Sequence, residues 1–168
     1  MNLFNNIYIL KAFPFITSLF CFLLMNLPIM PSGMGEITPM LGVIALSFWI
    51  IYLKNSLPFM SVFIIGLFHD IMIGTLLGVG SLAAIIIRLF IVRVASGKRT
   101  SLLKSFLIIS LSLVIWTFII ALPTFIKSSF SLSYSPIIFQ LLSSIVFSPI
   151  IMIILSFFLG KMKKYYYE

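Results

Sequence analysis

Six long apolar runs, each almost free of charged side chains, decide which folds are open to this chain. They span residues 12–30, 39–53, 57–68, 79–95, 102–126 and 136–159. A helix that crosses a bilayer needs about 20 apolar residues, with a range near 17–25, and the first, fourth, fifth and sixth runs reach that range. Only 8% of the residues are charged, whereas soluble domains carry about 25%. We therefore expect lipid to surround the chain.

The two shorter runs, residues 39–53 and 57–68, leave a choice of topology. With Lys54 and Asn55 between them, they form either two full crossings or one hairpin that enters the membrane and returns. We favour two crossings, with the third helix short and partly shielded by its neighbours. The sequence thus predicts an all-α membrane protein in which residues 1–168 form a single integral domain, a bundle of six transmembrane helices.

Basic residues are distributed unequally between the two sides of such a bundle. If the N-terminus is cytoplasmic, only Lys127 lies in an outside loop. The inside set is Lys11, Lys54, Arg93, Lys98, Arg99, Lys104, Lys161, Lys163 and Lys164. Cytoplasmic loops of membrane proteins are enriched in Lys and Arg, so both termini are predicted to be cytoplasmic.

The net charge of +8 has the same explanation. In a chain this apolar we interpret it as a topology signal and as contact with anionic membrane lipids, not as a nucleic-acid site. The first run also follows a basic residue, as a signal peptide does. No convincing cleavage site follows Met30, however, so this run is predicted to remain as a span.

The densest polar feature is the stretch 66–80, which holds one acid among four glycines. Glycine adopts positive φ and lets helices approach closely, so we expect a backbone break here between the third and fourth spans. Asp70 with Gly66, Gly74 and Gly78 is the candidate functional motif. Gly74 and Gly78 also have the spacing of a helix-contact motif. Asp70 either caps the fourth helix and pins the loop through backbone N–H groups, which we favour, or binds a ligand or ion.

Residues for catalysis or metal binding are scarce. His69 is the only histidine, Cys21 the only cysteine, and Glu36 the only acid besides Asp70 and the terminal Glu168. Paired carboxylates for acid–base catalysis and four ligands for a structural zinc site are therefore lacking. No nucleophile elbow accompanies a Ser-His-Asp set. The sequence predicts no enzymatic activity, no catalytic residue, no metal and no cofactor.

Arg88 is a cation placed within the fourth apolar run. It lies nine residues after Val79, which corresponds to about 13 Å of helix. A charge at that depth costs at least about 2.5–3.5 kcal/mol on insertion scales. Two interpretations stay open. Arg88 has a partner, such as Asp70, the carbonyls of the glycine loop or another protein, or its side chain snorkels to the cytoplasmic side beside Arg93.

The loop between the fourth and fifth runs is rich in basic side chains. It contains Arg93, Lys98, Arg99 and Lys104. Such a cluster can hold acidic lipid or an acidic partner. A plain topology signal is the simpler interpretation, and we favour it.

Three short segments of the second to fourth runs carry a resemblance to a known family. They are Pro39-Met40-Leu41 with Phe48-Trp49, then Gly66-Leu67-Phe68-His69-Asp70, then Gly74-Thr75-Leu76-Leu77-Gly78. They resemble the rod shape-determining protein MreD family. That family opens the second span with proline, ends it with a Tyr-Trp-like pair, and follows the third with the pattern G-xxx-D-xxx-G-xxx-G. Phe48-Trp49 departs mildly from the pair, and Arg88 is not part of the pattern.

The resemblance implies a bacterial inner-membrane scaffold without enzymatic activity, which serves the machinery for lateral peptidoglycan synthesis and rod shape. The implied partners are the single-span protein MreC, the actin-like filament MreB and the glycosyltransferase–transpeptidase pair of elongation. The family is also similar in fold to the substrate-binding subunits of energy-coupling-factor vitamin transporters. Such a subunit is the alternative function. Those subunits usually carry an Ala-xxx-Ala face on the first helix, and it is missing at residues 12–16.

Overall fold

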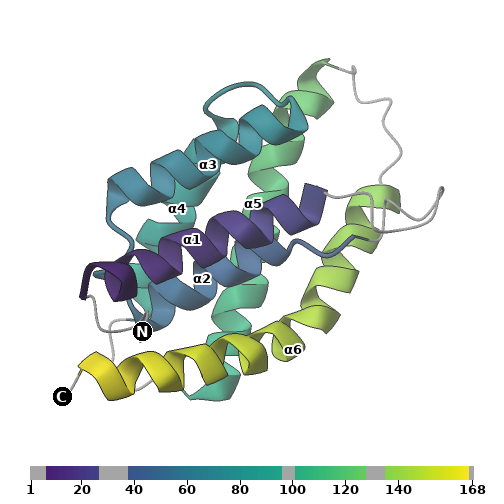
Figure 1. Ribbon diagram of the computed structural model, residues 1–168. Helices are drawn as coiled ribbons and strands as arrows, with labels where there is room; N and C mark the ends of the chain where they lie inside the picture. The colour runs from purple at the N-terminus through teal and green to yellow at the C-terminus, as the bar shows by residue number, and fades with distance from the viewer. Residues whose placement is uncertain (1–6, 27–37, 96–100, 128–134, 167–168) are drawn as a thin grey trace.

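The computed structural model describes residues 7–26, 38–95, 101–127 and 135–166. The regular structure of these residues is entirely helical, which confirms the predicted all-α class. The six helices are α1 (Ile7–Asn26), α2 (Leu41–Tyr52), α3 (Phe59–Ile73), α4 (Val79–Val94), α5 (Leu102–Lys127) and α6 (Ser135–Tyr166). Figure 1 shows that the start of α1 and the end of α6 lie at the same side of the bundle.

The helices follow the apolar runs, but α1 begins at Ile7 instead of residue 12 and α6 continues to Tyr166 instead of residue 159. The most informative difference is at α3. The apolar pattern predicts an end at Phe68, but the helix continues to Ile73. His69 and Asp70 are polar yet buried, so they belong to the core side of the last turns of α3. The break in the backbone therefore begins at Gly74, after the polar pair and not around it. The final residues of the first predicted run, 27–30, lie outside the described residues.

The short helix α2 forms the centre of the bundle. Nine consecutive residues, Gly42–Ile50, are buried, as expected of a helix that is apolar all round. Helices α1, α4, α5 and α6 each pack against it. The approach of α1 is especially close at Gly42, where a Cβ atom would overlap the ring of Phe22.

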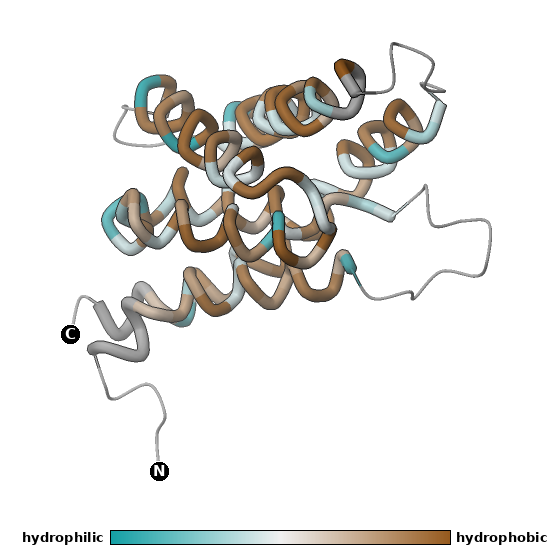
Figure 2. The backbone as a smooth tube through the Cα atoms, turned by 90° about the horizontal axis from the view of Figure 1, so that it is seen from above, coloured by the Kyte–Doolittle hydropathy of each residue, from teal (hydrophilic) through white to brown (hydrophobic). Residues whose placement is uncertain are grey.

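The outer helices expose large apolar side chains. Leu103 is 78% exposed and Met60 is 75% exposed. Figure 2 shows hydrophobic residues along most of the length of the helices, with hydrophilic residues mainly towards the helix ends. Soluble monomers rarely expose contiguous apolar patches larger than a few hundred Å². Two stretches, Leu102–Pro123 in α5 and Ser135–Met162 in α6, are long and apolar enough to cross a membrane. They indicate membrane association.

Two other apolar helices, α2 and α3, are shorter than a full crossing, because Leu41–Tyr52 and Phe59–Ile73 each have fewer than 18 residues. Helix α1 has 20 residues, but its side chains are described only over Ala12–Asn26, an apolar stretch of fewer than 18 residues. At 1.5 Å per residue, α2 measures about 18 Å, whereas the hydrocarbon core of a bilayer is about 30 Å thick. Within the described residues, length and composition therefore support two of the six predicted crossings.

Candidate functional site

The connection between α3 and α4 is built on two glycines with positive φ. Gly74 ends α3 with φ 74° and donates its N–H to the Asp70 carbonyl oxygen at 2.9 Å. Gly78 precedes α4 with φ 103°. A Cβ atom on either glycine would meet nothing within 4 Å, so the backbone conformation, not space, requires glycine. These glycines turn the chain and do not make the helix contact that their spacing also suggests.

The Asp70 carboxylate holds this connection from inside the bundle. Its side chain is fully buried. Oδ1 accepts from the Thr75 hydroxyl at 2.8 Å and from the Gly80 N–H at 2.9 Å, and Oδ2 accepts from the Gly78 N–H at 2.8 Å. Gly78 is the N-cap residue of α4, so the negative charge lies where the helix dipole and the free N–H groups favour it. These bonds agree with the capping and pinning role.

Close contact between α3 and α4 begins one turn before Asp70. A Cβ atom on Gly66 would meet the Cα of Ser81 and lie 2.6 Å from the Gly80 carbonyl oxygen. A Cβ atom on Gly80 would lie 2.5 Å from Asp70 Oδ1 and 2.8 Å from the Gly66 carbonyl oxygen. The two helices therefore meet backbone to backbone, as small residues permit, and the carboxylate fits beside them.

Two residues of this site, Thr75 and Gly80, were not selected from the sequence. Both lie within the stretch 66–80, and Gly80 is two residues after Gly78. A second glycine at a helix start was the only signal for Gly80. The sequence gave no signal for Thr75, because a threonine hydroxyl in a turn commonly bonds only to the nearby backbone.

His69 joins three helices through its ring. It is almost fully buried and packs edge-on between Phe22 of α1 and Trp116 of α5, with ring centroids 5.4 Å and 4.9 Å away. Its Nδ1 lies 3.7 Å from Asp70 Oδ1, which is beyond hydrogen-bond length. Aromatic packing is thus the main interaction of this side chain, and it anchors the Asp70 turn to the bundle core.

Arg88 reaches the opposite end of the α3–α4 hairpin. Its Nε donates to the Leu57 carbonyl oxygen at 2.8 Å and its Nη2 to the Lys54 carbonyl oxygen at 3.5 Å. The guanidinium carbon lies 4.2 Å from the centre of the Phe59 ring, a cation–π geometry. Arg88 therefore binds the α2–α3 connection and not Asp70. The side chain points to the side predicted to be cytoplasmic, and its guanidinium group binds backbone carbonyl oxygens there.

The basic cluster is described in part. Arg93 in the last turn of α4 and Lys104 in the first turn of α5 are both exposed. A cation in the last turn of a helix interacts favourably with the helix dipole, which accounts for Arg93. Lys98 and Arg99 lie outside the described residues.

The hydrogen bonds of this arrangement hold the chain itself together. Among the residues that the structure describes, no group of three His, Cys, Asp or Glu side chains could hold a metal ion. The carboxylate oxygens of Asp70 are engaged by the chain itself. The site shapes a rigid turn between two helices. No family model, no curated protein and no solved structure matches this chain.

Proposed function

We propose that this chain is a non-enzymatic scaffold of the bacterial cell-wall elongation complex, with six helices in the inner membrane and both termini in the cytoplasm. The Asp70 turn carries the proposal. Gly66, Asp70, Gly74 and Gly78 form the G-xxx-D-xxx-G-xxx-G pattern by which the chain resembles the MreD family. Gly66 allows the close packing of α3 on α4, Gly74 and Gly78 form the turn, and Asp70 binds it. The proposed partners are MreC, MreB and the glycosyltransferase–transpeptidase pair.

The geometry of the turn favours a scaffold over an enzyme. A general acid or base must come within hydrogen-bond reach of its substrate, and Asp70 is fully buried. What the turn offers to other molecules is its apolar rim, where Ile71, Leu76 and Leu77 are all more than half exposed. Exposed apolar side chains on a rigid turn suit lateral contact with a helix of a partner.

Burial supports a full crossing by the short helix α2. A helix of about 18 Å leaves part of a 30 Å hydrocarbon core unspanned, which is costly only where lipid touches it. Helix α2 is covered on all sides by its neighbours. Protein therefore replaces lipid around it.

The contacts of Arg88 support the proposed orientation. Its donors bind carbonyls of the α2–α3 connection, which also carries the exposed Lys54. The carboxylate of Asp70 lies at the other end of α4. The positive-inside rule puts the Lys54 end in the cytoplasm, so the Asp70 turn faces the opposite side, where the wall is built.

A detergent-solubilised affinity pull-down from a rod-shaped bacterium tests the scaffold proposal. We expect the tagged wild type to recover MreC and the wall-synthesis enzymes, identified by mass spectrometry. The Leu77→Gln variant should recover less of these partners, because Leu77 lies on the rim of the turn. The substitution leaves the hydrogen bonds of Asp70 intact. The matched control is Leu107→Gln, which changes a similarly exposed leucine on α5.

Two outcomes would contradict the proposal. Recovery of an ATPase pair with a small membrane partner, or of a bound vitamin, would identify a transporter subunit instead. Equal recovery of wall-synthesis proteins by Leu77→Gln and Leu107→Gln would show that the rim of the Asp70 turn makes no partner contact.

A further inference from the structure

The guanidinium group of Arg88 is held in one place near the end of α4. Arg88 lies six residues before Val94, where the helix ends, which corresponds to about 9 Å of helix. Its Nε is 2.8 Å from the Leu57 carbonyl oxygen and its Nη2 is 3.5 Å from the Lys54 carbonyl oxygen. The centre of the Phe59 ring is 4.2 Å from the guanidinium carbon. Three contacts with one short connection thus fix the position of this charge.

The positive charge of Arg88 is not neutralised within the described part of the chain. Asp70 is the one acid among residues 7–26, 38–95, 101–127 and 135–166, and its carboxylate binds Gly78 at the other end of α4. The two carbonyl oxygens engage two of the five N–H donors of the guanidinium, and neither oxygen carries a full charge. Arg88 is also partly exposed. Donors and charge therefore remain for an anion from outside the chain.

An apolar surface extends from Arg88 along the hairpin of α3 and α4. The two helices run antiparallel, since the Ser81 hydroxyl donates to the Phe63 carbonyl oxygen at 3.2 Å and Arg88 reaches Leu57. One side of each helix is buried in the bundle, whereas the outer side exposes large apolar side chains. These are Met60, Phe63 and Ile64 of α3 and Leu82, Ile86 and Leu89 of α4. The charge therefore lies at one end of an apolar surface.

A molecule with an anionic head and hydrocarbon tails complements both parts of this surface. A phosphate group accepts two parallel N–H bonds from one guanidinium, and acyl chains cover exposed apolar side chains. A partner's transmembrane helix would need an acid within its own apolar span, which membrane insertion disfavours. The phosphate of a lipid lies at the membrane boundary without that cost.

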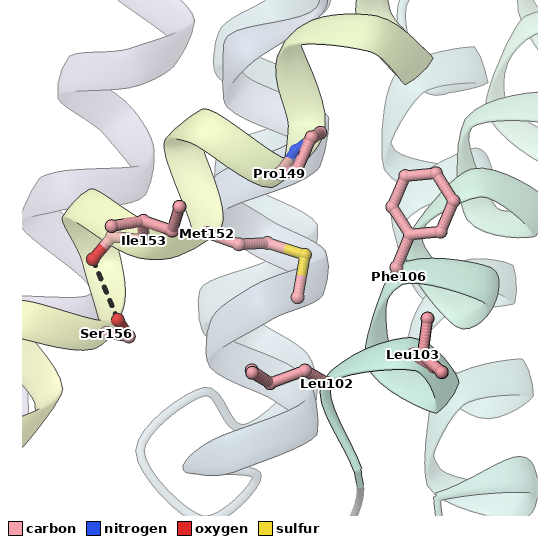
Figure 3. Close-up of a pocket in the computed structure, with 7 residues that line it drawn as sticks. All are labelled: Leu102, Leu103, Phe106, Pro149, Met152, Ile153 and Ser156. Carbon is pink, nitrogen blue, oxygen red and sulfur yellow. Dashed lines mark hydrogen bonds between the residues drawn. The ribbon is translucent and has the colours of Figure 1, made fainter.

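The groove between α5 and α6 has no such charge in its lining. Its lining is apolar apart from Ser156, whose hydroxyl donates to the Ile153 carbonyl oxygen at 2.7 Å (Figure 3). That lining does not distinguish one hydrocarbon from another. The surface at Arg88 differs because its charge discriminates between lipid headgroups.

We propose that Arg88 binds the phosphate of an anionic glycerophospholipid, whose acyl chains lie on the outer side of the α3–α4 hairpin. The inference rests on the membrane location within the proposed function and is independent of the proposed wall-synthesis partners. It gives the guanidinium a second role besides holding the α2–α3 connection. Basic residues at a membrane surface attract anionic lipids in this way.

Native mass spectrometry of the purified protein in neutral detergent tests the site. Phosphatidylglycerol is titrated against phosphatidylcholine of the same chains, whose choline cation offsets its phosphate. We expect the wild type to retain phosphatidylglycerol in preference. Arg88→Gln should reduce this preference at least about fivefold, the contribution of one cation near the membrane surface. Arg93→Gln removes an exposed cation five residues further along the same helix and should keep the preference.

A second matched pair keeps Arg88 and its bonds to the α2–α3 connection. Val92 lies four residues after Arg88 on α4, so Val92→Glu places a carboxylate beside the guanidinium. That carboxylate neutralises the charge and should lower the preference for phosphatidylglycerol at least about fivefold. Val92→Gln has the same shape without the charge and should keep the preference. Equal preference in the two Val92 variants, or equal loss in Arg88→Gln and Arg93→Gln, overturns the proposal.

Failure of the site and failure of the membrane location give different results. Alkaline extraction of membranes should leave the wild type in the pellet, and its release into the supernatant would refute the membrane location itself. If Val92→Glu stays in the pellet and keeps phosphatidylglycerol but loses a co-purifying membrane protein, this surface contacts a protein and the lipid proposal is wrong.

Discussion

Replacing Asp70 by alanine removes the acceptor for three donors at once. The Gly80 N–H is buried and would lose its bond without gaining water, which costs about 1–3 kcal/mol. The Gly78 N–H and the Thr75 hydroxyl are only partly buried, so they can bind water instead and lose a net of about 1 kcal/mol each. The expected loss in the free energy of unfolding for Asp70→Ala is therefore about 3–5 kcal/mol.

Intrinsic tryptophan fluorescence during heating of the detergent-solubilised protein measures this loss. Trp116 is a suitable probe because its ring lies 4.9 Å from that of His69, the residue next to Asp70. For a chain of this size, 1 kcal/mol shifts Tm by about 2–4 °C. Asp70→Ala should therefore lower Tm by about 6–20 °C.

Two graded variants check the reasoning. Asp70→Asn keeps one acceptor oxygen but directs an amide towards N–H donors, so it should lower Tm about half as much. Thr75→Val removes one partly buried hydrogen bond and should cost about 1 kcal/mol. A Tm for Asp70→Ala within about 2 °C of the wild type, or equal effects of alanine and asparagine, would refute the claim that the carboxylate holds the turn.

Five further substitutions, at four positions, test other contacts. Gly66→Ala should cost about 1–3 kcal/mol by overpacking against α4, measured by Tm, whereas Gly160→Ala, whose Cβ would enter open space, should stabilise α6 by about 0.5–1 kcal/mol; the reverse order would contradict the close crossing. Gly74→Ala should lower stability by about 1–2 kcal/mol because of its positive φ, and Gly74→Asn should lower it less; equal losses would count against the left-handed turn. Arg88→Gln should speed trypsin cleavage after Lys54 in inside-out vesicles by freeing the α2–α3 connection, and unchanged cleavage would argue against that anchor.

The apolar runs were enough to predict six helices, but they missed the start of α1 and the end of α6, where polar and basic residues continue the helix. They failed at the end of α3 because hydropathy treats His69 and Asp70 as surface residues, although both are buried. The burial of Asp70 depends on N–H groups up to ten residues further along the chain, and hydropathy carries no information about them. A polar residue that is satisfied by a later turn looks the same in sequence as one that ends a helix.

The glycines show a second limit of the sequence. Gly66 and Gly80 serve close packing, whereas Gly74 and Gly78 serve a turn, and their residue type is identical. Only the backbone angles and the neighbouring atoms separate the two roles. Similarly, Arg88 offered two interpretations from its depth, and its acceptors on the α2–α3 connection became visible only when the hairpin was formed.

The central position of α2 has a consequence for how the protein is made. Two of the helices that cover it, α5 and α6, are synthesised after it. In the proposed six-span topology, α2 is a short helix with half of its cover missing while the ribosome has yet to reach residue 102, and it is too short to span the hydrocarbon core by itself. Its final insertion is therefore coupled to the arrival of the C-terminal helices. Nascent chains that stop before α5 are expected to be removed by membrane proteases instead of accumulating as a stable half-bundle.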